Sequence, residues 1–359
     1  MSNELAKRIE AFLSRVTPLR SSQGNTGLAV GSIKGPREDN QDRVAVAYFG
    51  FPSGEGVLVG LVCDGMGGMV QGGEAAGCAA STFLGGMVAA SGRPLRNTLF
   101  ECVAAANREV YRRFRGAGGT TLTALAVTNA GEAWAAHVGD SRLYEIAHDR
   151  LPHLITRDDT IGGQLRTPDS TADDMLDNRL LQFVGIGASI EPHILRVQSG
   201  QGRSFLLTTD GAHSIGKRAL EGVVRTSGNV PEIVRKVLLV AEAIGVDDNC
   251  SAVAIMGSEF ERPKNYTGGT EVTVWSPGEK LEMWLGAPST PQVSPARERE
   301  ASLQGAAVEE KKVSPTKQKK PARAKSKQAK KSEGHSEPSP DTEKPQLNIE
   351  FGSRNEGTK

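Results

Sequence analysis

Apolar runs of strand length that end in an aspartate are the feature that most constrains this chain. The first run covers residues 58–63 and is followed at once by Asp64 and several glycines. An unbroken apolar run is typical of a strand buried on both faces, and glycines let other groups approach the backbone closely. An ordinary strand-to-turn junction would also contain Asp-Gly. The alternative is a carboxylate held on a rigid strand end beside an open loop, as a metal or phosphate site requires.

Repetition of this pattern favours the second interpretation. Further acids flank strand-like runs, namely Asp42 before 43–49, Asp140 after 134–139, Asp210 after 205–209 and Asp248 before 250–256. Because each acid lies at a strand end, a packed pair of sheets would bring them to one edge. Crowded like charges are unstable unless a cation neutralises them. Aspartates without nearby thiolates or imidazoles suit a hard ion such as Mg²⁺ or Mn²⁺.

The charge is divided unevenly along the 359 residues. Ten basic residues and no acid lie between Lys311 and Lys331, so the rest of the chain carries a formal net charge of −9 when the whole carries +1. An acidic body repels nucleic acid, which argues against a two-metal nuclease. For the basic run we favour a solvated linker over binding of nucleic acid or an acidic partner.

The four cysteines form no CxxC pair, and Cys63 and Cys250 fall within apolar runs. Buried free thiols in a reducing compartment are therefore expected. The first fifteen residues are charged and amphipathic, unlike a signal peptide, and no apolar stretch is long enough to span a bilayer. These observations predict a cytoplasmic protein, and we expect a monomer.

Composition and periodicity divide the chain into four parts. We predict an N-terminal helix and lead-in at 1–26, a globular domain at 27–260, a hairpin at 261–287 that needs a surface to dock on, and a disordered basic tail with a short apolar end at 288–359. Within the domain, the polar segment at about 156–190 is expected to be a surface flap near the acids. Helices are predicted at 5–16, 71–90, 95–114 and 231–243.

Six motifs, in this order, resemble those of the bacterial metal-dependent serine/threonine protein phosphatases, the type 2C (PPM) family. They are Arg37-x-x-Asn40-Gln41-Asp42, Asp64-Gly65-Met66-Gly67-Gly68, Gly119-Thr120-Thr121, Val138-Gly139-Asp140-Ser141-Arg142, Thr209-Asp210-Gly211 and Asp248-Asn249. The resemblance covers residues 27–256. It implies an α+β fold, a four-layer α-β-β-α sandwich of two antiparallel sheets flanked by helices.

The resemblance also implies how a metal centre would be built. Asp64 matches the carboxylate that bridges two metal ions, and Gly65 matches the position whose carbonyl is a ligand. Asp210 and Asp248 match further ligands of the first metal. Asp42 matches an acid that reaches the metals directly or through water. The cofactors implied are two Mn²⁺ or Mg²⁺ ions.

Two further roles and three departures complete the comparison with that family. Asp140, with Asp210, resembles the site of a third, weaker metal ion, and Arg37 matches the guanidinium that grips the substrate phosphate. Met66 stands where relatives from higher organisms have histidine, and Gln41 stands where an acid is common. The Asp-His pair usual in the flap is Asp158-Asp159 in this chain.

The resemblance thus implies a phosphoprotein phosphatase acting on phosphoserine and phosphothreonine, opposed by a serine/threonine kinase, with metal-activated water as the nucleophile. The main alternative is a catalytically silent, phosphatase-like regulatory protein, since fold does not guarantee activity. Cys63 lies beside carboxylates, which would raise the pKa of its thiol and make it inert. We expect His137 and His213 to be structural or surface residues.

Overall fold

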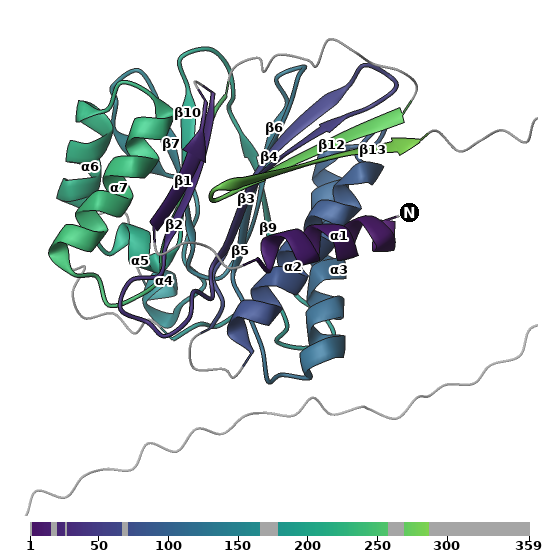
Figure 1. Ribbon diagram of the computed structural model, residues 1–359, viewed down its shortest axis with the longest axis horizontal. Helices are drawn as coiled ribbons and strands as arrows, with labels where there is room; N and C mark the ends of the chain where they lie inside the picture. The colour runs from purple at the N-terminus through teal and green to yellow at the C-terminus, as the bar shows by residue number, and fades with distance from the viewer. Residues whose placement is uncertain are drawn as a thin grey trace, which may run out of the picture. The chain divides into compact units, whose positions relative to one another are not determined.

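The computed structural model describes residues 2–15, 20–25, 27–66, 71–165, 179–257 and 269–286, which all fall in one compact unit (Figure 1). The predicted disordered tail at 288–359 lies outside the described residues, as do Gly67 and Gly68 of the glycine-rich loop. No helix in the described part of the chain is both long and apolar enough to cross a membrane.

The first sheet has six strands within the described residues, and each neighbouring pair is antiparallel. Across the sheet, the strands are β1 (Arg20–Gly24), β2 (Leu28–Ile33), β11 (Cys250–Met256), β10 (Ser204–Thr208), β7 (Arg142–Ile146) and β8 (Pro152–Leu154). The polar strand β1 was not predicted, because an edge strand needs no apolar run.

The second sheet has seven strands within the described residues and is also antiparallel throughout. Its strands, in order, are β13 (Glu279–Gly286), β12 (Gly269–Ser276), β3 (Arg43–Gly50), β4 (Gly56–Cys63), β5 (Leu122–Thr128), β6 (Ala133–Val138) and β9 (His193–Val197). The predicted strand run at 58–63 is therefore a central strand, fully buried along β4.

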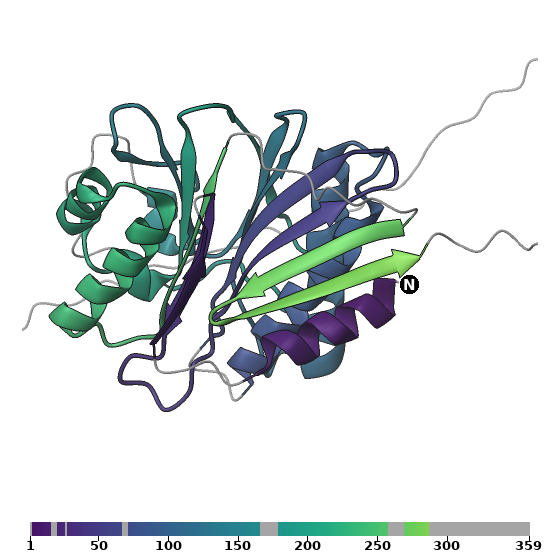
Figure 2. The same ribbon diagram turned by 45° about the horizontal axis from the view of Figure 1, so that its top comes forward.

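Helices cover the outer face of each sheet, as Figures 1 and 2 show. The second sheet is covered by α1 (Ser2–Leu13), α2 (Gly72–Gly86) and α3 (Leu95–Phe114), and the first by α5 (Asp210–His213), α6 (Lys217–Thr226) and α7 (Val230–Ile244). The short α4 (Ile161–Leu165) and the 3₁₀ turn η1 (Met87–Ala89) complete the helices of the described residues.

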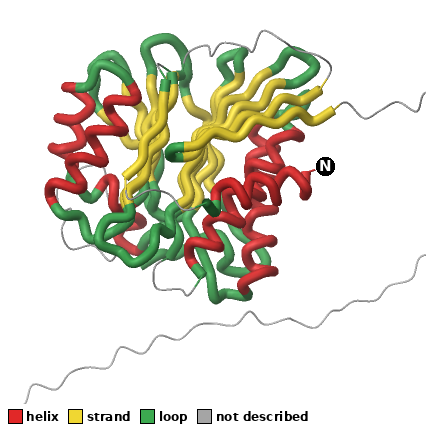
Figure 3. The backbone as a smooth tube through the Cα atoms, viewed as in Figure 1, coloured by secondary structure: helices red, strands yellow, loops and turns green. Residues whose placement is uncertain are grey.

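Three apolar cores hold the four layers together. One lies between α1–α3 and the second sheet, one between α5–α7 and the first sheet, and one between the two sheets. Figure 3 shows the strands enclosed between two groups of helices. The α-β-β-α sandwich implied by the sequence motifs is confirmed.

The hairpin β12–β13 extends the second sheet beyond β3. Its strand β12 pairs with β3 from Glu271 opposite Gly50 to Trp275 opposite Val46. Val272 and Val274 are fully buried against the helical layer, and Glu279 at the start of β13 forms an ion pair with Arg15 just after α1 (2.7 Å). The surface that the hairpin needs is thus supplied by β3 and α1.

Candidate active site

The predicted acids meet in one open pocket of about 760 Å³ at the ends of the central strands. Asp64 directly follows β4, Asp140 lies between β6 and β7, Asp210 begins α5 directly after Thr209, and Asp248 precedes β11. Predicted site residues that line this pocket are Arg37, Asp64, Gly65, Asp140, Asp210 and Asp248. Strands from both sheets therefore contribute carboxylates to the same space.

Asp42 lies behind these acids and is 5% exposed. Thr209 Oγ1 donates a hydrogen bond to its Oδ2 (3.0 Å), whereas its Oδ1 has no hydrogen-bond partner in the described part of the chain. Burial, followed by the nearby charge of Asp210, raises the pKa of Asp42 from its ordinary value of 3.8 to about 7. A buried carboxylate oxygen without a partner is costly.

Three carboxylates that line the pocket, those of Asp64, Asp140 and Asp210, also have raised pKa values. Burial raises the pKa of Asp64 well above its ordinary value, and Asp42 and then Asp210 add to that rise. The pKa of Asp140 is raised to about 7 by burial and then by Asp210. Burial and the charge of Asp248 raise the pKa of Asp210. Such mutual repulsion is relieved when a cation enters the group.

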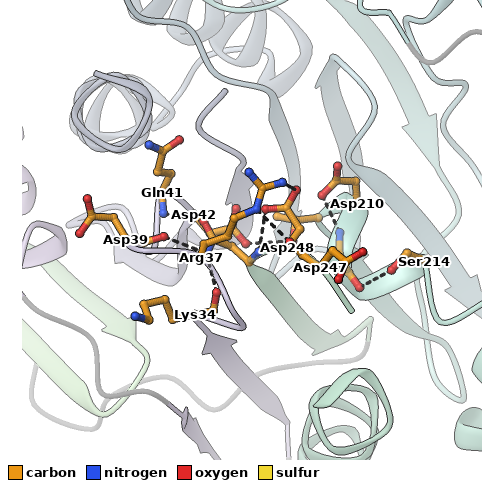
Figure 4. Close-up of polar contacts among 12 residues, drawn as sticks. Lys34, Arg37, Asp39, Gln41, Asp42, Asp210, Ser214, Asp247 and Asp248 are labelled. Carbon is orange, nitrogen blue, oxygen red and sulfur yellow. Dashed lines mark hydrogen bonds and ion pairs between the residues drawn. The ribbon is translucent and has the colours of Figure 1, made fainter. Parts of the chain in front are cut away.

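Arg37 is the predicted phosphate ligand and lies at the rim of the pocket. Its Nη2 donates to Asp248 Oδ2 (2.7 Å) and its Nε donates to the carbonyl oxygen of Asp247 (2.9 Å). Figure 4 shows the guanidinium and the Asp248 carboxylate facing one another, with Asp210 and Asp42 nearby. The Arg37 side chain is 46% exposed, so solvent and a phosphate group can reach it.

Asn249 fixes the loop that carries Arg37 and Asp42. Its Oδ1 accepts a hydrogen bond from the backbone N–H of Gln41 (2.8 Å), and its Nδ2 donates to the carbonyl oxygens of Lys34 (2.7 Å) and Asp39 (3.0 Å). Asn249 is 5% exposed. The sequence contained the signal for this role, because Asn249 belongs to the quoted Asp248-Asn249 motif.

Thr121 supports Asp64 from the neighbouring strand end. Its Oγ1 accepts a hydrogen bond from the Asp64 backbone N–H (2.9 Å) and shares one with the Ser141 hydroxyl (2.7 Å). Because Ser141 follows Asp140, this one hydroxyl ties together the loops of two pocket acids. Hydroxyl-to-backbone bonds of this kind hold functional side chains in place.

The segment predicted as a surface flap is buried where it begins. Asp158 is 9% exposed and accepts bonds from both Nε and Nη2 of Arg142, and Asp159 is 4% exposed. Polarity alone suggested solvent exposure, but ion pairing and hydrogen bonding allow these carboxylates to be buried. Arg179 and Leu180, where the described chain resumes, line the acidic pocket. The sequence placed this segment near the acids but did not indicate which of its residues reach the pocket.

Neither Cys63 nor His137 is placed for chemistry. Burial and the charges of Asp42 and Asp64 raise the pKa of the Cys63 thiol, so the thiolate nucleophile is suppressed. His137 is fully buried, with its Nδ1 2.9 Å from Thr123 Oγ1 and its Nε2 2.9 Å from the carbonyl oxygen of Arg157. All four cysteines are free and buried, as expected.

The donor set of the pocket fits a hard divalent ion. Its possible donors are carboxylate and carbonyl oxygens, Asp42 Oδ1 has no hydrogen-bond partner in the described part of the chain, and burial and like charges raise the pKa values of Asp42 and Asp64, an effect that a bound cation would oppose. As they stand, no three His, Cys, Asp or Glu side chains of the described residues are grouped so that they could hold an ion. Asp248 is engaged by Arg37 in this arrangement.

Comparisons with known proteins add to this geometry. No family model matches the chain, and no curated protein does. Solved structures do match, beginning with the PPM Ser-Thr phosphatase MsPP from Mycobacterium smegmatis, at 28% identity and a TM-score of 0.55 over 65% of this chain and 99% of that one. The protein has the fold of the bacterial PPM phosphatases.

A second PPM-type structure is the serine/threonine phosphatase PstP from Mycobacterium tuberculosis, with 23% identity and a TM-score of 0.54 over 66% of this chain and 99% of that one. The PstP catalytic domain in complex with two manganese ions gives 23% identity and a TM-score of 0.52 over 66% and 98%. Nearly all of each PPM neighbour is matched, whereas about a third of this chain extends beyond them.

Proposed function

We propose that this protein is a metal-dependent phosphatase that hydrolyses phosphoserine and phosphothreonine in proteins. The observation that carries the proposal is the convergence of Asp64, Asp140, Asp210 and Asp248 on one pocket with Arg37 at its rim. The fold shared with PPM Ser/Thr phosphatases supports it, and so does the manganese bound by one of those neighbours.

The chain offers ligands for two Mn²⁺ or Mg²⁺ ions. Asp64, the carbonyl of Gly65, Asp210 and Asp248 would hold them, with Asp42 in support and Asp140 beside Asp210 as part of a third, weaker position. When bound, such ions polarise phosphate oxygens and lower the pKa of water.

The remaining groups bind and orient the substrate. Arg37 can donate two parallel hydrogen bonds to a phosphate, as its planar guanidinium allows. The described residues that line the pocket include no cysteine, serine or histidine, and the nearby Cys63 is buried and its thiol has a raised pKa. Met66 lines the pocket where an imidazole could have donated a proton, so the leaving oxygen must take its proton from water.

The decisive experiment is hydrolysis of a phosphothreonine peptide by the full chain with Mn²⁺, then with excess chelator, then with Mn²⁺ restored. We expect release of phosphate that stops with the chelator and returns with the metal. Activity that persists in chelator would contradict the mechanism. No activity in any condition, with Mn²⁺ binding intact by calorimetry, would favour the silent regulatory protein that the sequence left open.

Arg37→Ala is expected to raise KM for the phosphopeptide about tenfold and to lower kcat less, because one charge-assisted contact to the phosphate is lost. Steady-state kinetics at saturating Mn²⁺ measures both. Arg93→Ala is the matched control, because Arg93 also forms an exposed ion pair, with Glu101 (2.8 Å), outside the pocket. An unchanged KM in Arg37→Ala would remove Arg37 from substrate binding.

A further inference from the structure

Asp159 is a buried carboxylate to which the proposed mechanism gives no role. It is 4% exposed, and all of its polar atoms are engaged. Its Oδ2 accepts from the Gly139 backbone N–H (2.9 Å) and from Gln182 Nε2 (3.2 Å), and its Oδ1 lies 2.8 Å from His193 Nε2. These three partners belong to different parts of the chain, so Asp159 connects three segments by hydrogen bonds, and we call it a junction.

The first arm of this junction holds the peptide before Asp140. Gly139 donates its N–H to the Asp159 carboxylate, and its carbonyl oxygen accepts from the Asp159 backbone N–H (2.7 Å). Gly139 has a φ of 105°, and a Cβ there would lie 2.7 Å from Thr121 Cγ2. The peptide is thus confined between Thr121 and Asp159. Its conformation sets where Asp140 enters the acidic pocket.

The second arm holds the wall of the same pocket. The Leu181 backbone N–H donates to the carbonyl oxygen of Asp159 (2.7 Å), and Thr160 forms a β-bridge with Leu180. Leu180 lines the acidic pocket. The returning end of the predicted flap is therefore bonded to the same residue that holds Gly139.

The third arm anchors the junction to the second sheet. His193 lies on β9, and its ring stacks on that of the buried His137 with centroids 5.9 Å apart. His193 is 46% exposed, whereas the Asp159 side chain is 5% exposed. An imidazole fixed by a neighbouring strand thus holds Asp159 Oδ1 and leaves Oδ2 for Gly139.

We propose that Asp159, anchored by His193, is a positioning residue that sets the direction of Asp140 and the position of the pocket wall at Leu180. Asp159 does not line the acidic pocket, and it acts through Gly139 and Leu181. Its effect on hydrolysis rests on the proposed phosphatase function, whereas its effect on the Gly139 peptide does not.

The activity test is a double-mutant cycle between Asp159→Asn and Asp140→Asn, measured as kcat/KM with Mn²⁺. Alone, Asp159→Asn is expected to lower kcat/KM and apparent Mn²⁺ affinity about 10- to 100-fold, as is usual for residues that orient metal ligands. In the Asp140→Asn background it should change kcat/KM less than about twofold, because coupled residues are not additive. Full additivity would overturn the proposal.

Asp149→Asn is the matched control for this cycle. Asp149 forms the comparable carboxylate–imidazole pair with His153 (2.6 Å), but both side chains are about half exposed and lie outside the acidic pocket. Exposed pairs contribute little to stability. This variant should keep the kinetics of the natural protein.

Hydrogen exchange of the metal-free protein tests the positioning without activity. In Asp159→Asn, the Gly139 and Leu181 amides should exchange at least about tenfold faster, while amides in α3 keep their protection. Unchanged protection of Gly139 would overturn the proposal. If Asp159→Asn does not fold, His193→Ala replaces it, with faster Gly139 exchange expected and His193→Gln expected to restore protection.

The kinetic cycle and the hydrogen-exchange measurement together distinguish a failure of the proposed phosphatase function from a failure of the positioning role of Asp159. If the natural protein hydrolyses no phosphopeptide, the proposed function fails, but the exchange of Gly139 still decides whether Asp159 positions that peptide. If hydrolysis is metal-dependent and the cycle is additive, the function stands and the positioning role fails.

Discussion

Replacing Asp64 with asparagine is expected to abolish phosphopeptide hydrolysis and to raise the stability of the metal-free protein. Asparagine keeps the shape of the side chain but removes the Asp64 carboxyl group. Burial and the charges of Asp42 and Asp210 raise the pKa of that carboxyl group. If Asp64 holds the metal ions as proposed, loss of its carboxylate should cost at least about a thousandfold in kcat/KM, which is several kcal/mol of transition-state stabilisation. Relief of repulsion should add about 0.5–2 kcal/mol to the free energy of unfolding.

These opposite effects distinguish a functional cluster from a structural one. Urea unfolding in chelator and kinetics with Mn²⁺ measure the two quantities in the same preparation. Glu74→Gln serves as a control, because Glu74 is an exposed acid in the first turn of α2 outside the pocket, and both values should stay unchanged. If Asp64→Asn lowers stability, or keeps more than about a tenth of the activity, the acids serve the fold and not the proposed chemistry.

Strand and helix positions followed largely from periodicity. The helix predicted at 95–114 agrees with α3 at both ends, since its apolar stripe is long and regular. The helix α6 (Lys217–Thr226) was not predicted, because only Leu220, Val223 and Val224 are buried in its ten residues. These three residues nevertheless lie at helical spacing, so the signal for α6 was present in the sequence within a segment of only ten residues.

The convergence of the pocket acids was predictable because each acid is marked locally by the strand that it follows or precedes. Asp159 carries no such mark. The partners of its carboxylate, Gly139, Gln182 and His193, lie 20, 23 and 34 residues away in the sequence. Only the folded chain shows that Asp159 is hydrogen-bonded in the interior. The burial of its neighbour Asp158 likewise depends on an ion pair with Arg142.

The metal-free protein is expected to lose stability as the pH rises from about 4 to 8, and Mn²⁺ should reverse that trend. The pKa of Asp42 and that of Asp140 are both raised from 3.8 to about 7 in the folded state. The folded protein therefore binds more protons than the unfolded chain between these values, so unfolding becomes easier as the pH rises. At pH 8 a pKa shift of this size lowers the free energy of unfolding by up to about 4 kcal/mol for one carboxyl group. For two carboxyl groups that interact, the loss is less than twice that.

Urea unfolding in chelator at pH 5, 6.5 and 8 measures this slope, and the Asp42→Asn, Asp140→Asn double variant removes the contribution of these two carboxylates. Burial lowers the pKa of His137, so that residue alone would make stability rise with pH. The double variant keeps His137 and also keeps Asp64 and Asp210, whose pKa values are raised, so its stability should decline less steeply with pH than that of the natural protein. Mn²⁺ binds the deprotonated carboxylates, so its stabilisation should grow toward pH 8. A metal-free stability that is level or rises between pH 5 and 8 in the natural protein, and equally in the variant, would mean that these carboxylates are already compensated within the fold and have no need of a cation.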